Sequence, residues 1–147
     1  MSTTTDITLD MARALIANIR AEGRKLGLKP LSVVVLDRGG NVTAFEREDG
    51  ASNLRFNMAY AKAYGCIGVG LGGRAMMARA ETQAYFVNSL TAAFGGNVLP
   101  VPGGILLRAE AGGAIIGAVG ITGDTSDQDE AAGLAGIAAA GLVGDGG

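Results

Sequence analysis

Apolar residues near the start of the chain recur every three or four positions, which is the spacing of one face of a helix. The pattern covers residues 9–26, with Thr8 placed to cap the helix and Gly27 placed to end it. A second segment with helical spacing covers residues 53–66, and Ser52 stands where a cap is expected. The pattern therefore predicts two helices before the middle of the chain.

Two other segments have the pattern of antiparallel hairpins. Residues 31–47 combine a β-branched apolar run with a later alternating segment, and the turn 38–41 between them contains two glycines and an asparagine. The short apolar runs 105–107 and 114–121 are likewise separated by a glycine pair. Each segment predicts two neighbouring strands.

The last helix has an unusually acidic start. Thr125 is a preferred N-cap residue, and Gln128 stands three positions later, as in a capping box. Asp127, Asp129 and Glu130 suit the positive end of the helix dipole. The simplest interpretation is that these acids mainly start the helix, since a binding role needs a cation or a donor facing them.

Two remaining stretches are also predicted to be helical. One covers much of residues 74–94 and ends at a glycine pair, and the other is the nearly uncharged segment 131–143. Helix, two strands, two helices, two strands and helix then follow one another along the chain. This order favours an α+β fold, with helices packed on an antiparallel sheet, over alternating crossover units.

Length and composition favour one domain over residues 1–147, because two domains in 147 residues would each be small. A mean hydropathy of +0.31 is high for a small monomer and predicts a homo-oligomer. The stretch 131–143 is too short to cross a bilayer, so we expect no membrane insertion. The net charge of −2 predicts no nucleic-acid partner.

The chain contains no histidine, which excludes Ser-His-Asp and Cys-His catalysis and any histidine-ligated metal. Cys66 is the single cysteine and lies among small residues, where a buried and inert thiol is expected. We expect no metal site. The N-terminal residues 1–6 lack a basic segment followed by an apolar core, so a cytoplasmic location is expected.

Several glycines allow a functional and a structural interpretation. The run 68–73 lacks the spacing of a nucleotide loop. Gly117 and Gly120 fall inside a predicted strand, where another backbone or a ligand comes close. Gly103 and Gly104 could offer backbone N–H groups to a ligand anion.

Asp124 lies beside the start of the last helix and could orient a hydroxyl group or a water molecule. Ordinary turn chemistry explains Asp124 and the Gly103–Gly104 pair equally well. All three residues are therefore candidates for ligand binding with a structural alternative.

Several short motifs occur in the order found in one known family. They are 33–40, 48–51, 61–63, 102–104, 117–123 and 127–130. On these motifs the chain resembles the GlcG/HbpS family, which includes haem-binding proteins and the C-terminal domains of PduO-type proteins. The resemblance implies a profilin-like α+β sandwich that forms homo-oligomers and binds a small molecule.

The resemblance also implies that haem, or another hydrophobic anionic ligand, is bound. Without histidine, axial ligation of haem would have to come from a methionine or from a residue in this set: Tyr60, Tyr64, Tyr85, Cys66. Arg55, Arg74 or Arg108 could face the propionates of haem, although each is equally suited to solvent or to an interface. We include Arg55 and Arg108 among the candidate ligand-binding residues.

The alternative is a small enzyme, lyase-like or hydrolase-like, that acts on a small organic or aromatic acid. The family resemblance implies this enzymatic alternative, because the GlcG/HbpS family includes hydroxylaminobenzoate lyase-like proteins. Lys62 is the candidate proton carrier, since a helix could hold its amine beside apolar surface and lower its pKa. Alternatively, the stem of Lys62 only covers that surface. Asp49 could pair with Lys62 or simply make its turn.

Overall fold

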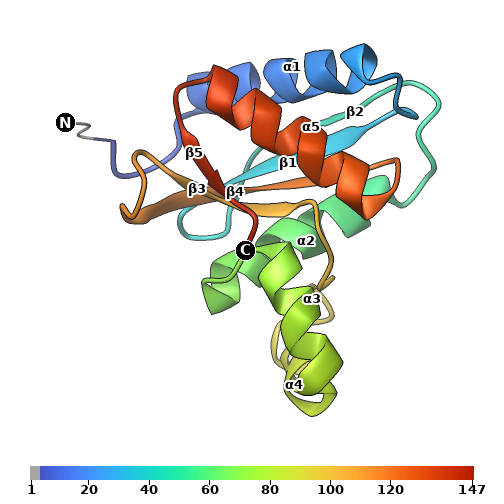
Figure 1. The fold of residues 1–147 in the computed structure, drawn as a ribbon, viewed down its shortest axis with the longest axis vertical. Coiled ribbons are helices and arrows are strands. Elements are labelled where there is room, and N and C mark those ends of the chain that lie inside the picture. Colours follow the sequence, from blue (N-terminus) through green and yellow to red (C-terminus); the bar gives the residue numbers. More distant parts are fainter. Residues whose placement is uncertain (1–3) are drawn as a thin grey trace.

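The computed structural model describes residues 4–147, which form five helices and five strands (Figure 1). In chain order they are α1 (Leu9–Lys25), β1 (Ser32–Asp37), β2 (Val42–Arg47), α2 (Arg55–Val69), α3 (Gly73–Thr82), α4 (Ala84–Ala93), β3 (Gly104–Arg108), β4 (Ile115–Thr122), α5 (Ser126–Ala139) and β5 (Val143–Asp145). The fold is α+β, as predicted.

The strands form one antiparallel sheet in the order β2-β1-β4-β3-β5. Both predicted hairpins are confirmed, because β1 pairs with β2 and β3 pairs with β4. In the first turn, Asp37 Oδ1 accepts hydrogen bonds from the backbone N–H groups of Gly39 and Asn41, both at 2.9 Å. The carboxylate thus satisfies donors that the turn leaves without strand partners.

One face of the sheet is covered by α1 and α5, which lie side by side above it in Figure 1. Large aliphatic side chains fill this layer, including Leu15 and Ile19 of α1 and Ile121 of β4, all fully buried. The predicted caps are confirmed: Thr8 Oγ1 accepts from Met11 N, and Thr125 Oγ1 accepts from Gln128 N.

The other face is covered by α2, which packs across β4, β1 and β3. The close approach predicted at Gly120 is confirmed, because a Cβ there would overlap the Ala59 carbonyl of α2. At Gly117 a Cβ would lie 2.5 Å from the Leu36 carbonyl oxygen of β1. Gly120 therefore lets helix α2 sit nearer the sheet than a larger side chain would allow, whereas Gly117 makes room for Leu36 and Ile7.

Helices α3 and α4 project from this second face as an arm (Figure 1). The expectation of one helix over residues 74–94 is wrong, because Gln83 has φ −136° and ψ 57° and separates two helices. The Gln83 side chain accepts a hydrogen bond from Arg79 Nε at 2.9 Å, and the Arg79 guanidinium lies 3.9 Å from the centre of the Phe86 ring. These contacts stabilise the break between the two helices.

Three other local expectations need correction. Helix α2 runs to Val69 rather than residue 66, and its N-cap Leu54 has no side-chain hydrogen bond, so Ser52 does not cap it. Helix α5 ends at Ala139 rather than at residue 143, and Val143 instead begins β5, which pairs with β3. Among residues 4–147, no helix is long and apolar enough to cross a membrane.

Candidate functional site

A buried ion pair joins α2 to the point where β4 leads into α5. Lys62 Nζ donates to the Ile121 carbonyl oxygen at 2.8 Å and to Asp129 Oδ2 at 3.2 Å. The side chains of Lys62 and Asp129 are only 3% and 1% exposed. Asp129 Oδ1 also accepts from the Asp124 backbone N–H at 2.9 Å. The pair therefore ties together three elements inside the protein.

Burial shifts both members of this pair toward their neutral forms. Desolvation lowers the pKa of Lys62, and the nearby Asp129 carboxylate opposes this shift. Desolvation likewise raises the pKa of Asp129, against the attraction of Lys62. Because the Lys62 side chain is almost fully buried, a ligand would reach its amine only after a local opening of the structure.

The two glycines of the predicted anion-binding turn lie against Lys62. Gly103 has φ +105°, and a Cβ there would lie 2.8 Å from Lys62 Nζ. A Cβ at Gly104 would lie 2.6 Å from the Lys62 carbonyl oxygen and 2.7 Å from Cys66 Sγ. Both glycines are buried, so in this structure they make room for α2.

Asp124 lies beside the same ion pair and organises the backbone around it. Its carboxylate accepts hydrogen bonds from the Lys29 N–H at 2.9 Å and the Thr125 N–H at 2.8 Å. These backbone donors, first that of Lys29, lower the pKa of Asp124. Asp124 thus fixes the entry to α5 and the segment before β1.

Arg55 starts α2 at the edge of this group. Its Nη1 donates to Thr122 Oγ1 at 2.7 Å, and its Nε donates to Ser52 Oγ at 2.8 Å. Thr122 is the last residue of β4, directly after Ile121, whose carbonyl binds Lys62. The structure therefore brings Arg55, Lys62, Asp124 and the Gly103–Gly104 pair to one end of β4.

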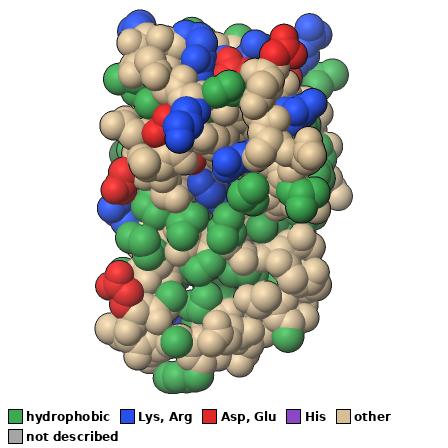
Figure 2. Space-filling model, turned by 90° about the vertical axis from the view of Figure 1, so that its right-hand side faces the viewer, with side chains coloured by type: hydrophobic (Ala, Val, Ile, Leu, Met, Phe, Trp, Pro, Cys, Tyr) green, Lys and Arg blue, Asp and Glu red, His purple; other side chains and the backbone are tan. Residues whose placement is uncertain are grey.

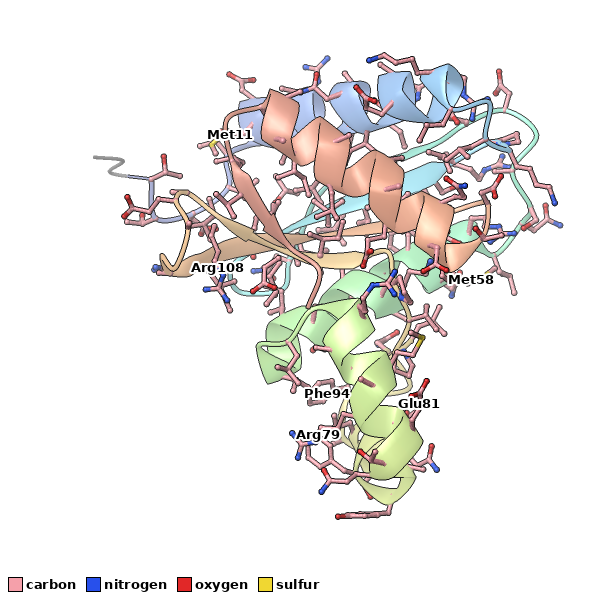
Figure 3. All side chains as sticks on the ribbon, viewed as in Figure 1. Met11, Met58, Arg79, Glu81, Phe94 and Arg108 are labelled. Carbon is pink, nitrogen blue, oxygen red and sulfur yellow. The ribbon has the colours of Figure 1, made fainter. Side chains whose placement is uncertain are left out.

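Arg108 and Asp49 lie elsewhere. Arg108 donates to Asp145 Oδ2 and to the Gly113 carbonyl oxygen, and it lies at the opposite end of the sheet from Met58 (Figure 3). Asp49 lines a shallow surface pocket that also includes Arg20, Arg24, Pro30 and Glu48. The carboxylate partner of Lys62 is therefore Asp129 rather than Asp49.

The contacts of Arg74 and the burial of Cys66 indicate structural roles rather than ligand binding. Arg74 pairs with Asp127 and Glu130 and thereby joins α3 to α5. Cys66 is fully buried, and burial raises the pKa of its thiol to about 12. The thiolate required of a nucleophile or a metal ligand is therefore strongly disfavoured at Cys66.

A row of aromatic rings follows the β2 side of α2. Phe56 and Tyr60 stack with ring centres 5.7 Å apart, and Tyr60 and Tyr64 stack at 5.0 Å. Phe45 of β2 closes one end of the row at 4.9 Å, and Phe94 closes the other at 6.1 Å, each edge to face. We call these five residues the aromatic row.

The aromatic row is partly exposed and its hydroxyl groups are free. Phe56 is 38% exposed, and Tyr60 and Tyr64 are half-buried. Within residues 4–147, neither tyrosine hydroxyl has a protein hydrogen-bond partner. Burial raises the pKa of Tyr60, and the adjacent Tyr64 adds to this effect, so the phenol of Tyr60 is neutral near pH 7.

Sequence reasoning missed the roles of four residues in these surroundings. The sequence pattern indicates Asp129 only as one of the acids that start α5, although three acids exceed what one cap requires, and this surplus is the available signal. No local pattern marks Arg47, Ser32 or Thr122 as site residues. They meet only because β2, β1 and β4 are neighbours in the sheet, which their local sequences do not show.

Comparisons with known proteins agree on one family and one fold. The family model described as "Haem degrading protein HbpS-like" matches residues 7–138. No curated protein sequence matches the chain. The structure of the Streptomyces reticuli HbpS double mutant is 26% identical in sequence, with a TM-score of 0.76, over 95% of this chain and 90% of that one.

Two further solved structures share the fold. The PduOC–haem complex has a TM-score of 0.82 at 22% identity, over 93% of this chain and 96% of that one. The Klebsiella pneumoniae protein ORFY has a TM-score of 0.78 at 21% identity, over 95% of this chain and 96% of that one. The observed sandwich is therefore the fold that the sequence motifs imply.

Proposed function

Because this chain belongs to the HbpS-like family, we propose that it binds haem or another flat, hydrophobic and anionic small molecule. The aromatic row on α2 is the observation that carries this proposal. It offers stacked rings along one helix face, where the planar body of a ligand can pack. The PduOC structure holds haem on the same fold, which supports this ligand class.

The available donors fit haem in one way. Cys66 is buried, and the sulfur of Met58 already faces Arg55 Nη1 at 3.8 Å. Within the aromatic row, the donors suited to haem iron are the phenol oxygens of Tyr60 and Tyr64. Tyrosine is an established axial ligand of haem iron. Tyr60 or Tyr64 would hold the iron after losing its proton, a loss that the raised pKa of Tyr60 opposes at that residue. Phe56 would pack against the porphyrin. Bound haem would supply an iron centre for redox chemistry.

A haemin titration tests this proposal. We expect a saturable Soret band with the wild-type protein, and a changed iron spectrum in the double variant Tyr60→Phe/Tyr64→Phe. Tyr85→Phe tests the remaining candidate tyrosine. Because Tyr85 is 70% exposed on α4 and lies outside the aromatic row, we expect this variant to keep the wild-type spectrum. A titration that never saturates contradicts haem binding, and an unchanged spectrum in the double variant contradicts the tyrosine ligands.

We also propose that this protein forms a homo-oligomer. Among the described helices and strands, α4 contacts only α3, and its exposed side carries Tyr85, which is 70% exposed, among small residues. Burial of this face by a second copy would remove apolar surface from water. Analytical ultracentrifugation should detect an assembly in the wild type, and Tyr85→Glu should weaken it. A wild-type monomer at micromolar concentration contradicts this part of the proposal.

A second candidate is the small enzyme acting on an organic acid, with Lys62 carrying the proton. The lowered pKa of Lys62 is the observation in its favour. Replacing the pair together, as Lys62→Met/Asp129→Leu, avoids leaving one buried charge alone. If the folded double variant retains turnover of a substrate that the wild type converts, Lys62 is not the proton carrier.

A further inference from the structure

Three polar side chains lie side by side on three neighbouring strands, near the start of α2. Ser32 of β1 pairs with Arg47 of β2 on one side and with Thr122 of β4 on the other. Residues opposite one another in an antiparallel pair share a face of the sheet. All three therefore lie on the α2 face, where Arg55 donates to Thr122 from above.

Ser32 carries an unsatisfied hydroxyl group. Its Oγ is fully buried and has no hydrogen-bond partner among the described residues. A buried polar group without a partner loses its hydrogen bonds to water and gains none in the protein, which destabilises the folded state. Such a group in the middle of a polar row indicates a position where a missing partner would bind.

The two arginines beside Ser32 also lack an acidic partner. Arg47 donates to the Ala51 carbonyl oxygen, and Arg55 donates to Ser52, Thr122 and Met58, but neither contacts a carboxylate within residues 4–147. Both guanidinium groups hold the short segment between β2 and α2. The result is two positive charges beside two hydroxyl groups, with no compensating negative charge in contact.

From this arrangement we infer a carboxylate-binding site formed by Arg47 and Arg55, with Ser32 and Thr122 as hydroxyl partners. Guanidinium groups bind carboxylates through paired, charge-assisted hydrogen bonds. The Arg47 side chain is exposed, whereas Ser32 Oγ is fully buried. Binding therefore requires the side chains of this row to shift, after which a carboxylate held by the arginines accepts the free hydrogen of Ser32.

The site adjoins the aromatic row. Phe45 precedes Arg47 by two positions on the same face of β2, and Phe56 follows Arg55 directly. Figure 2 views the side on which α2 begins and shows Lys and Arg side chains above a band of hydrophobic ones. The ligand class is thus an aromatic carboxylate, with its ring toward Phe45 and Phe56. This inference rests on the proposed function, because it assigns the anionic end of that ligand.

Benzoate and benzamide test the carboxylate site, since they share a ring and differ in charge. We expect benzoate to perturb the NMR signals of residues 32, 47, 55 and 122, and benzamide to leave them unchanged. Arg47→Gln and Arg55→Gln should each weaken benzoate binding about tenfold or more. Arg13→Gln should not, although Arg13 is exposed like Arg47, because it lies on α1 beyond the sheet. Equal binding of benzamide, or full binding by both variants, overturns the inference.

Ser32→Ala separates a ligand contact from a packing role. Removing an unsatisfied hydroxyl should leave the unliganded protein as stable as before, or more stable, while benzoate affinity falls. A merely structural serine would not give these opposite effects, and unchanged affinity would remove Ser32 from the site.

Haemin distinguishes the inference from the proposed function. If haemin fails to bind while benzoate binding depends on Arg47 and Arg55, haem is the wrong ligand and the carboxylate site stands. If haemin and its dimethyl ester bind equally well to the wild type and to Arg47→Gln/Arg55→Gln, the proposed function stands. The arginines then bind no carboxylate of that ligand, and the inference fails.

Discussion

The two faces of the sheet are packed with different kinds of side chains. The face under α1 and α5 is filled by large aliphatic side chains, such as Leu15, Ile16 and Ile137. The face under α2 is filled largely by smaller residues, such as Ala59 and Ala118. The aromatic row lies beside them, along the β2 side of α2. The buried polar side chains lie on this second face or at its edge, and they are Ser32, Lys62, Thr122 and Asp129.

This contrast separates stability from chemistry. A layer of close-packed aliphatic side chains buries much apolar surface and offers no polar group to a ligand. The α2 face buries less and must satisfy ions and hydroxyls, which costs stability unless each has a partner. We therefore expect the α1–α5 layer to hold the fold and the α2 layer to hold the ligand.

The largest effect should come from breaking the buried ion pair on the α2 side. Asp129→Leu leaves the Lys62 charge buried alone and should lower the free energy of unfolding by about 3–5 kcal/mol. Lys62→Met added to it should restore most of that loss, as measured by urea denaturation. Asp127→Ala, at an exposed position of the same helix, is the control and should change stability little. A single variant as stable as the wild type would refute the pairing.

Truncation in the aliphatic layer should cost somewhat less. Leu15→Ala removes a fully buried side chain beneath α1 and should lower the free energy of unfolding by about 2–5 kcal/mol. Leu9→Ala on the same helix should have little effect, because Leu9 is 53% exposed. Benzoate affinity should be unchanged in both folded variants. A selective loss of binding in Leu15→Ala would show that the two faces are not independent.

The smallest effect concerns Cys66 and pH. Its pKa is raised to about 12 in the folded protein from 9.0, so between these values the folded state keeps a proton that the unfolded state loses. Stability should therefore fall as the pH rises through this interval, with about 2 kcal/mol lost near pH 10.5. Cys66→Ala should lack this contribution. The measurement is the difference in urea unfolding between wild type and variant at pH 8 and pH 10.5, and parallel pH profiles would contradict it.

Local sequence signals predicted most of the fold. The β-branched run and the glycine-containing turn of residues 31–47 predicted a hairpin, and Thr125 predicted the start of α5; both are confirmed. The break at Gln83 was missed, since it depends on contacts that Arg79 makes with Gln83 and Phe86. The strand β5 was missed because its three residues form a strand only beside β3.

The sequence by itself determined the elements, because turn geometry, capping and hydrophobic spacing act between residues a few positions apart. It also determined that this protein works without imidazole, since it contains no histidine. Only the tertiary structure decided which acid faces Lys62, because Asp129 lies 67 positions away and resembles its acidic neighbours in local sequence. It likewise decided that Arg47, Ser32 and Thr122 meet, since strand order, rather than local preference, sets which side chains share a face.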